Sequence, residues 1–264
     1  GAMPEAHARA SGPWRALRAA ALPLLLLGLF EALARRAAAL GSEQLAPPSA
    51  ALRALLRAAL DGSLWPATGF TLGAAALGLL IGAGLGTLVG IGLGLSPRAS
   101  RAGFLSIELL RPLPSVALLP LVMLLFGFGT DLEVSLVAFS TFWPQVLLVQ
   151  SAVRQVDPQL LELGRLLGLS TARRIRLIVL PTIAPRLLTA VRMGTGFSLV
   201  IALTVEIAGN PQGMGFAMLL AQQSLEPAMM IGWLMWIGAI GVLVNTGMLR
   251  LQRALNRRLG VTVP

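Results

Sequence analysis

The chain has 264 residues, of which 56% are hydrophobic and only 12% are charged. This mixture is more apolar than a soluble globular domain carries, and it indicates an integral membrane protein. The formal net charge of +10 does not require nucleic acid as a partner, because the arginines flank apolar segments in the way that orients membrane proteins. The lack of cysteine excludes disulfides and thiolate chemistry.

The chain begins with a polar tail, residues 3–18, which we expect in the cytoplasm, and the first apolar segment follows over residues 19–40. The second half of that segment carries Glu31, Arg35 and Arg36, which are costly in a bilayer. Because Glu31 and Arg35 are four residues apart, they can pair on one helix face and lower this cost. We therefore predict a poor but real first span.

A short amphipathic helix is predicted next, capped by Ser49 and ending at Leu60. Its apolar side carries Leu52, Leu55, Leu56 and Ala59, and its opposite, charged side carries Arg53 and Arg57. Such a helix is expected to lie on the outer membrane surface. Residues 19–66 thus form a first span with its outer helix, and residues 67–255 form the core membrane domain.

The second span is predicted over residues 68–95, and glycine recurs in it at every fourth position. The glycines of this stripe are Gly78, Gly82, Gly86, Gly90 and Gly94. A stripe of small residues allows close approach by a neighbouring helix. Tight packing is the favoured interpretation, and a sliding interface that permits motion is the alternative.

Four further spans follow, at about residues 111–129, 134–153, 185–208 and 229–249. Pro120 is expected to kink the third span or to leave a carbonyl unpaired, and a partly amphipathic helix over residues 98–110 precedes this span. Residues 210–227 form an outer connection, and residues 256–264 form a basic cytoplasmic tail. Trp233 is expected at the membrane interface or facing lipid.

The arginine distribution predicts the topology. All arginines except four lie at the two termini and in the loops after spans two and four; the exceptions are Arg35, Arg36, Arg53 and Arg57. Six spans with both termini in the cytoplasm satisfy the positive-inside rule. This arrangement also places the loop after span four, residues 157–181, on the cytoplasmic side.

The segment of residues 157–181 is too polar to cross a bilayer. Asp157 is a good N-cap and Pro158 suits a first helical turn. Gly168 breaks this helix, and Ser170 can cap a second, arginine-rich one. The first helix has an apolar face made of Leu160, Leu163, Leu166 and Leu167. We interpret the segment as a docking element for a soluble partner.

The same segment resembles the "EAA" signature of ABC-importer permeases, which reads E-A-A, three residues, G, nine residues, I-x-L-P. Leu163 and Gly164 replace the two alanines. In that family the segment is the coupling helix, which sits in a cleft of the ATP-binding subunit. The residues that the resemblance assigns to ATPase coupling are Glu162, Gly164, Arg165, Gly168, Ile178, Leu180 and Pro181.

The resemblance extends over about residues 45–255. Residues 111–129 are similar to the third-span motif of permeases for sulfonates, taurine and nitrate, although Thr130 and Asn245 stand where many relatives carry acidic residues. The resemblance implies an all-α, polytopic membrane protein with the type I ABC importer permease fold, in a bacterial inner membrane. It also implies a homodimer, two ATP-binding cassette subunits and an extracytoplasmic substrate-binding protein.

The chain lacks a G-x-x-x-x-G-K-[ST] segment and any lysine to serve one, so ATP and Mg²⁺ are expected on the partner ATPase and this chain is not an enzyme. No cofactor or metal site is predicted, because the single histidine, His7, lies in the polar tail and no ligand cluster accompanies it. The protein is expected to transport its cargo by alternating access, driven by the partner ATPase through the docking helix.

Polar residues within the spans are the candidates for the translocation pathway: Ser140, Thr141, Gln145, Ser198 and Glu206, with Phe126 at the outer mouth. For each, interhelical bonding or packing is the alternative, and a carboxylate on the route would repel an anion. The cargo is predicted to be a small anion such as a sulfonate, taurine or nitrate. A neutral or cationic cargo such as a vitamin precursor, or a stand-alone secondary carrier, are the alternatives.

Overall fold

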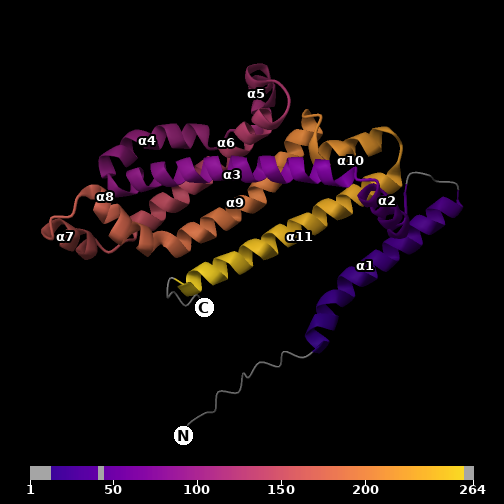
Figure 1. Ribbon diagram of the computed structural model, residues 1–264, viewed down its shortest axis with the longest axis horizontal. Helices are drawn as coiled ribbons and strands as arrows, with labels where there is room; N and C mark the ends of the chain where they lie inside the picture. The colour runs from indigo at the N-terminus through magenta and orange to yellow at the C-terminus, as the bar shows by residue number, and fades with distance from the viewer. Residues whose placement is uncertain (1–12, 41–44, 259–264) are drawn as a thin grey trace, which may run out of the picture.

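The computed structural model describes residues 13–40 and 45–258, and every regular element within these ranges is a helix (Figure 1). Of the two predicted tails, residues 13–18 and 256–258 fall in the described part, and both stretches belong to helices. His7 lies outside it. The polar composition of residues 13–18 predicts a tail, whereas helix α1 (Pro13–Ala39) already includes them.

Three long helices form the centre of the bundle: α3 (Leu64–Leu95), α6 (Thr130–Arg154) and α9 (Leu180–Ala208). They run side by side, and α11 (Pro227–Arg258) lies along α9 (Figure 1). Each includes one of the predicted spans and extends beyond it by several residues. Because apolar side chains and small residues line the shared faces, these helices bury one another.

The glycine stripe of α3 is the closest contact in the bundle. A Cβ atom added at Gly78 would lie 2.6 Å from Val137 Cβ of α6, and one added at Gly90 would lie 2.8 Å from the Val146 carbonyl oxygen. Real Cβ atoms do not approach neighbours this closely, so only glycine fits. The structure therefore confirms the predicted close approach as tight packing of α3 against α6.

Helix α2 (Pro48–Leu60) follows α1 and packs on α11. The predicted cap at Ser49 is wrong, because the helix starts at Pro48 with Pro47 as its N-cap. Ser49 instead donates from Oγ to Glu31 Oε1 at 2.7 Å and from its backbone nitrogen to Glu31 Oε2 at 3.0 Å. The same carboxylate forms the predicted ion pair with Arg35, at 2.7 Å. Glu31 thus joins α1 to α2.

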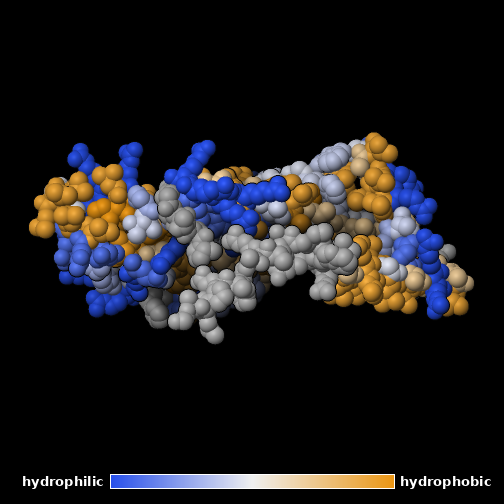
Figure 2. Space-filling view, turned by 90° about the horizontal axis from the view of Figure 1, so that it is seen from below, coloured by the Kyte–Doolittle hydropathy of each residue, from blue (hydrophilic) through white to orange (hydrophobic). Residues whose placement is uncertain are grey.

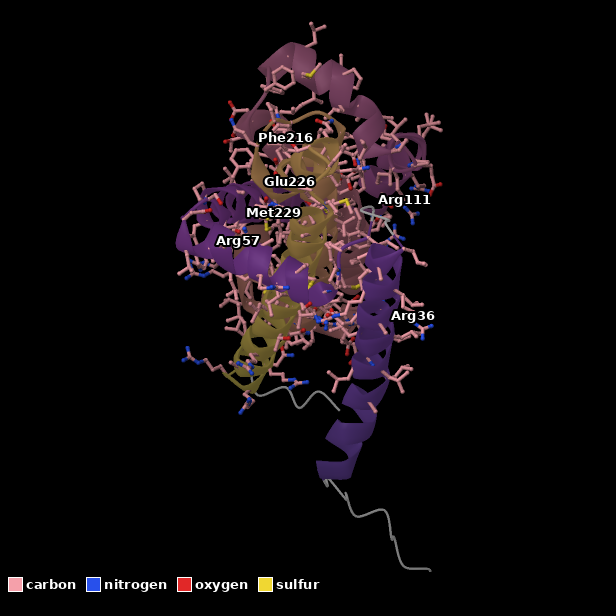
Figure 3. The ribbon with its side chains drawn as sticks, turned by 90° about the vertical axis from the view of Figure 1, so that its right-hand side faces the viewer. Arg36, Arg57, Arg111, Phe216, Glu226 and Met229 are labelled. Carbon is pink, nitrogen blue, oxygen red and sulfur yellow. The ribbon has the colours of Figure 1, made fainter. Side chains whose placement is uncertain are left out.

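The inward face of α2 also differs from the amphipathic pattern. Alanines and one leucine pack inward, namely Ala51, Ala54, Leu55 and Ala58, whereas Leu52 and Leu56 are exposed. Figure 3 shows Arg57 of α2 and Arg36 of α1 projecting away from the helices. The small side chains let α2 lie against α11, where Gly232 approaches the Ala51 carbonyl oxygen.

The outer connection is more ordered than predicted. Residues 210–227 contain a helix, α10 (Gly213–Gln223), which packs against α9 and α11. Trp233 of α11 is only 3% exposed and lies in a core cluster with Leu64 and Met214, so its expected place at the interface or in lipid is wrong. The apolar face of α10 supplies the surface that buries this ring.

The predicted third span is broken. Helix α4 (Pro97–Leu110) matches the predicted amphipathic helix, and it is followed by the short 3₁₀ helix η1 (Ser115–Leu118) and by α5 (Leu119–Phe126). Pro120 begins α5 rather than kinking its middle, as suits a residue without a backbone N–H. At about 1.5 Å per residue, α5 alone spans only about 12 Å.

Four helical segments in the described residues are long and apolar enough to cross a membrane: α3, α6, Thr171–Ala208 and α11. A fifth arises if Pro97–Leu110 and Ser115–Phe126, which are bent by 79°, count as one span. Helix α1 is not among these segments, and its second half carries Glu31, Arg35 and Arg36. The protein is all-helical and polytopic, and six spans stay a prediction.

Candidate functional site

The predicted docking segment forms at one end of the bundle, far from α2 and α10 (Figure 1). Asp157 caps helix α7 (Pro158–Leu166), because its side chain accepts from the Gln159 backbone nitrogen at 2.8 Å. Ser170 caps the next short helix, α8 (Thr171–Arg174), by accepting from the Arg173 backbone nitrogen. Both predicted caps are confirmed.

Gly168 ends α7 as predicted. Its φ of +69° lies in the left-handed region that favours glycine. The Leu169 backbone nitrogen donates to the Gly164 carbonyl and the Gly168 nitrogen donates to the Arg165 carbonyl, both at 3.0 Å. These two bonds form a Schellman motif, so the sharp reversal between α7 and α8 follows from the sequence.

The apolar face of α7 points away from the rest of the chain. Its leucines are exposed to different degrees: Leu160 42%, Leu163 51%, Leu166 85% and Leu167 68%. Figure 2 shows hydrophobic residues among hydrophilic ones at this end of the molecule. Leu161, in contrast, packs against the core cluster of Val153, Val156 and Val179. One face therefore anchors α7 and another is left for a partner.

The residues of the family signature divide between these two roles. Gly164 is buried, and a Cβ there would meet the Arg174 side chain at 3.1 Å and Ile178 Cδ1 at 2.9 Å. Ile178 and Leu180 pack on the core cluster. The remaining signature residues are exposed: Glu162, Arg165, Gly168 and Pro181.

A π-helical turn, η2 (Ile175–Val179), joins α8 to α9. This turn could not be predicted from the sequence, because a π turn differs from an α turn only by one extra residue and no residue type specifies it. Such turns occur as single-turn bulges, frequently at functional sites. Here the turn lies within the signature and connects the docking segment to the span α9.

Glu206, the leading pathway candidate, is fully buried in a hydrogen-bonded cluster at the other end of the bundle. Its Oε1 accepts from the Thr71 hydroxyl and its Oε2 from the Gly215 backbone nitrogen, both at 2.6 Å. Thr71 Oγ1 in turn accepts from the Met214 nitrogen at 2.9 Å. The carboxyl group thereby joins α3, α9 and the start of α10.

Glu133 and Asn210 extend this cluster; Asn210 lies in the predicted outer connection, and Glu133 is not among the predicted site residues. Asn210 donates from Nδ2 to Glu133 Oε2 at 3.0 Å and accepts at Oδ1 from the Gly129 nitrogen at 2.9 Å. Both residues are fully buried. A signal existed for Glu133, since it is four residues before Val137 and eight before Thr141, on the face of α6 that meets α3.

The other pathway candidates on α6 bond mostly within the bundle. Ser140 donates to the Leu136 carbonyl at 2.7 Å and Thr141 to the Val137 carbonyl at 2.9 Å, so both satisfy their own helix. Gln145 reaches across to α3, where its Nε2 donates to Thr87 Oγ1 at 3.1 Å. Of the three, Gln145 makes the side-chain hydrogen bond that links α6 to α3.

An open groove of about 1040 Å³ lies between α3, α9 and α11. Ser198 lines it together with Thr87 and Thr195, and none of the residues lining it is ionisable. The remaining candidate, Phe126, is 55% exposed at the end of α5 and lies apart from this groove. Of the candidates, Ser198 therefore lines the groove, and Gln145 is linked to it because its partner Thr87 is another lining residue. Glu206 does not line the groove.

Comparison with known families gives a match over residues 82–261 to "Binding-protein-dependent transport system inner membrane component". The matched region includes the docking segment, α9 and α11. It covers more than half of the chain.

Curated relatives agree with this family. The chain is 30% identical to the taurine transport system permease protein TauC of Escherichia coli, over 80% of this chain and 78% of that protein. It is 30% identical to the putative aliphatic sulfonates transport permease protein SsuC of E. coli, over 88% of each. It is 28% identical to SsuC of Bacillus subtilis, over 72% of this chain and 65% of that protein.

Solved structures show the same fold. A chain of the MetNI methionine ABC transporter in an inward-facing conformation aligns with a TM-score of 0.60 at 18% identity, over 72% of this chain and 93% of that one. A chain of an amino acid ABC transporter aligns with a TM-score of 0.60 at 19% identity, over 77% and 97%. The chain therefore belongs to the family of binding-protein-dependent transport system inner membrane components, as a multi-pass ABC-importer permease that is not the ATPase of its system.

Proposed function

We propose that two copies of this chain form the permease of an importer for a small anion, with a sulfonate or taurine as the favoured cargo. The names of the relatives support this class. The groove supports it as well, because its polar lining consists of neutral hydroxyl groups. Glu206, which would repel an anion on the route, is instead engaged by Thr71 and Gly215.

The exposed leucine face of α7 is the observation that supports coupling of this permease to an ATP-binding subunit. An apolar face at the end of a membrane bundle requires a protein partner to cover it, and the outward leucines of α7 provide such a face. We assign it to the cleft of an ATP-binding cassette subunit, which binds ATP and Mg²⁺. Closure of two such subunits would move α7, and η2 would pass the motion to α9.

The pathway is proposed along the groove between α3, α9 and α11. Ser198 would line it directly, and Gln145 would orient the Thr87 hydroxyl beside it. Glu206 would hold α3 and α9, which form two of its walls, and Ser140 and Thr141 would bond within the adjoining helix α6. The two proposed ends are cytoplasmic at α7 and external at α10, where a substrate-binding protein would deliver cargo.

Reconstitution tests this function. The permease, its ATPase and its binding protein in liposomes are expected to accumulate taurine or an alkanesulfonate only when ATP and Mg²⁺ are on the ATPase side. Uptake of an amine or a vitamin precursor, without uptake of these anions, would contradict the proposed anionic cargo and favour a neutral or cationic one. Uptake by the permease alone would contradict the importer assignment.

Two matched variants test the docking face. Leu166→Glu places a charge on the proposed contact, and Leu60→Glu makes the same change at an equally exposed leucine of α2 (85% and 88% exposed). Because a charge desolvated against an apolar cleft is costly, Leu166→Glu is expected to weaken ATPase binding at least tenfold, measured by affinity co-purification and by light scattering. Leu60→Glu should bind like the wild type. Equal loss in both variants contradicts docking through α7.

A further inference from the structure

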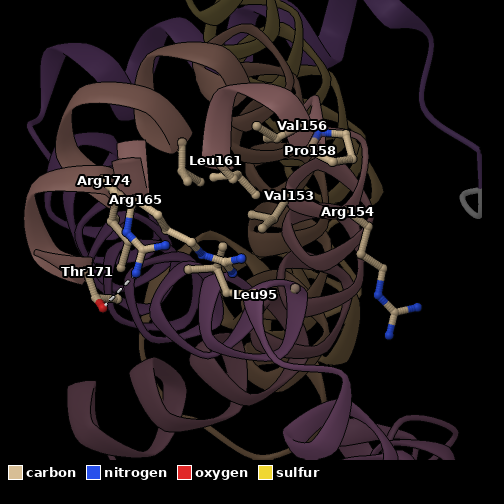
Figure 4. A pocket seen from close by; sticks show the side chains of 12 residues that line it. Leu95, Val153, Arg154, Val156, Pro158, Leu161, Arg165, Thr171 and Arg174 are labelled. Carbon is tan, nitrogen blue, oxygen red and sulfur yellow. Dashed lines mark hydrogen bonds between the residues drawn. The ribbon is translucent and has the colours of Figure 1, made fainter. Parts of the chain in front are cut away.

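A cavity of about 300 Å³ lies behind the docking segment, where α7 and α8 face the ends of α3 and α6 (Figure 4). Its volume is at the lower end of the range for small-molecule sites. Its walls come from five elements, so it is a place where the docking segment and the membrane helices meet.

The polar side of this cavity is positive. Three arginines line it, namely Arg154, Arg165 and Arg174, and none of its lining residues is acidic. Arg154 is bonded to the Ser100 hydroxyl, and Figure 4 shows it directed away from the other two. Among the described residues, the one ion pair is that of Glu31 and Arg35, far from this cavity. Arg165 and Arg174 thus face the space without a carboxylate partner.

Arg174 is positioned in advance by its neighbours. Its Nη2 donates to Thr171 Oγ1 at 3.1 Å, as the dashed line in Figure 4 shows. Its side chain crosses α7 at Gly164, the position where a Cβ would displace it. Its Nε is buried and has no hydrogen-bond partner among the described residues. The guanidinium is thus held at the wall of the cavity with its charge unpaired within the described part of the chain, and an oxyanion is the group that pairs with a fixed cation of this kind.

The opposite side of the cavity is apolar. Leu161 and Ile175 are only partly buried and present the accessible apolar surface, and they pack against Val153, Val156 and Val179, which are nearly inaccessible to solvent. A charged inorganic ion would leave this wall uncovered. A short alkyl chain would bury it.

We propose that this cavity is a binding site for a small aliphatic oxyanion, with the anionic head on Arg165 and Arg174 and the alkyl tail against Leu161 and Ile175. A bound molecule would join α7 and α8 to the ends of α3 and α6, and so restrain the docking segment. The binding rests only on the cavity; its effect on transport rests on the proposed function.

Binding of butane-1-sulfonate to the permease–ATPase complex, in nanodiscs of zwitterionic lipid without ATP, tests the site by calorimetry. Saturable binding is expected. Arg174→Gln is expected to raise the Kd about tenfold or more, as for the loss of one charge-assisted hydrogen bond, and Arg165→Gln should act in the same direction. Arg176→Gln removes an equal charge from an exposed residue outside the cavity and should change the Kd less than twofold.

Further probes separate the parts of the proposal. Sulfate lacks the tail and should bind at least tenfold more weakly, and butylammonium should not bind. Equal affinity for sulfate would overturn the assignment of the apolar wall to a tail. Equal effects of Arg174→Gln and Arg176→Gln would reduce the binding to general surface charge and overturn the site. Binding to the permease alone but not to the complex would assign the cavity to an acidic side chain of the ATPase instead.

ATP-driven uptake by the same preparation reports on the proposed function separately. A preparation that transports but does not bind butane-1-sulfonate at the Arg174-dependent site overturns only the inference about the cavity. A preparation that binds but does not transport overturns only the proposed function.

Discussion

Single residues in the bundle act mainly by completing hydrogen bonds, and Glu206 is the clearest case. Its two oxygens satisfy the Thr71 hydroxyl and the Gly215 backbone nitrogen, both buried. Glu133 and Asn210 bond beside it, and together they hold α3, α6, α9 and α10. Buried polar groups of this kind are costly to leave unpaired, so the cluster fixes how the helix ends meet.

Replacement of Glu206 should therefore lower stability in proportion to the bonds lost. Glu206→Leu leaves the buried Gly215 nitrogen unpaired, which costs about 1–3 kcal/mol, and leaves the Thr71 hydroxyl only the Ala67 carbonyl at 3.1 Å, so a clear drop in Tm is expected. Glu206→Gln keeps one acceptor and should lose less.

Thr204→Val on the same helix is the control, because that hydroxyl bonds only to the Val200 carbonyl of its own helix. Thermal unfolding of the detergent-solubilised protein, followed by tryptophan fluorescence, gives the Tm of each variant for this comparison. If Glu206→Leu unfolds at the same temperature as Thr204→Val, the cluster does not stabilise the bundle.

Among the elements, α3 and α6 form the closest pair, and the reason is the spacing of glycine at every fourth residue of α3. Each glycine of the stripe faces a side chain or carbonyl of α6, from Val137 near one end to Val153 near the other. The α6 residues follow the same four-residue period. Two helices with matching periods can pack along their whole length.

A larger side chain on the stripe should separate these helices. Gly90→Leu would place its Cβ 2.8 Å from Val149 Cβ, whereas Gly92→Leu, two residues further along α3, meets nothing within 4 Å. Overpacking costs about 1–3 kcal/mol, so Gly90→Leu is expected to lower the Tm and Gly92→Leu to leave it close to wild type. Fluorescence-detected gel filtration after a heat step compares them. A similar loss for both would show that α3 meets α6 less closely.

For the molecule as a whole, the two ends of the bundle differ in chemistry. The α7–α8 end carries exposed arginines and leucines, whereas the α10 end carries the buried Glu133–Glu206–Asn210 cluster. Helix α11 runs from the α10 end back toward the α7–α8 end (Figure 1). The positive-inside rule predicts a cytoplasmic location for α7, α8 and the end of α11.

The lack of cysteine makes this topology directly testable, because single cysteines can be introduced into an unreactive background. Thr171→Cys on α8 and Asp131→Cys at the start of α6 are both exposed positions at opposite ends. In intact cells, a membrane-impermeant maleimide is expected to label Asp131→Cys and to spare Thr171→Cys. In inverted vesicles the pattern should reverse. Labelling of Thr171→Cys from outside would contradict a cytoplasmic docking segment.

The sequence by itself determined the membrane class, the long spans and the docking segment, because these depend on local chemistry. Hydropathy and length set the spans, and glycine spacing predicts the close approach of a neighbouring helix to residues 68–95. Asp157, Gly168 and Ser170 cap or end helices through neighbouring backbone groups.

Only the tertiary structure decided the roles that depend on distant partners. Ser49 is a good capping residue, yet it bonds to Glu31, 18 residues away. Glu206 and Trp233 are found in the interior because α3 and α10 come to cover them. The same holds for the cavity behind α7, whose walls are far apart in the chain. Such contacts depend on how helices pack together, and no local pattern specifies which side chains meet there.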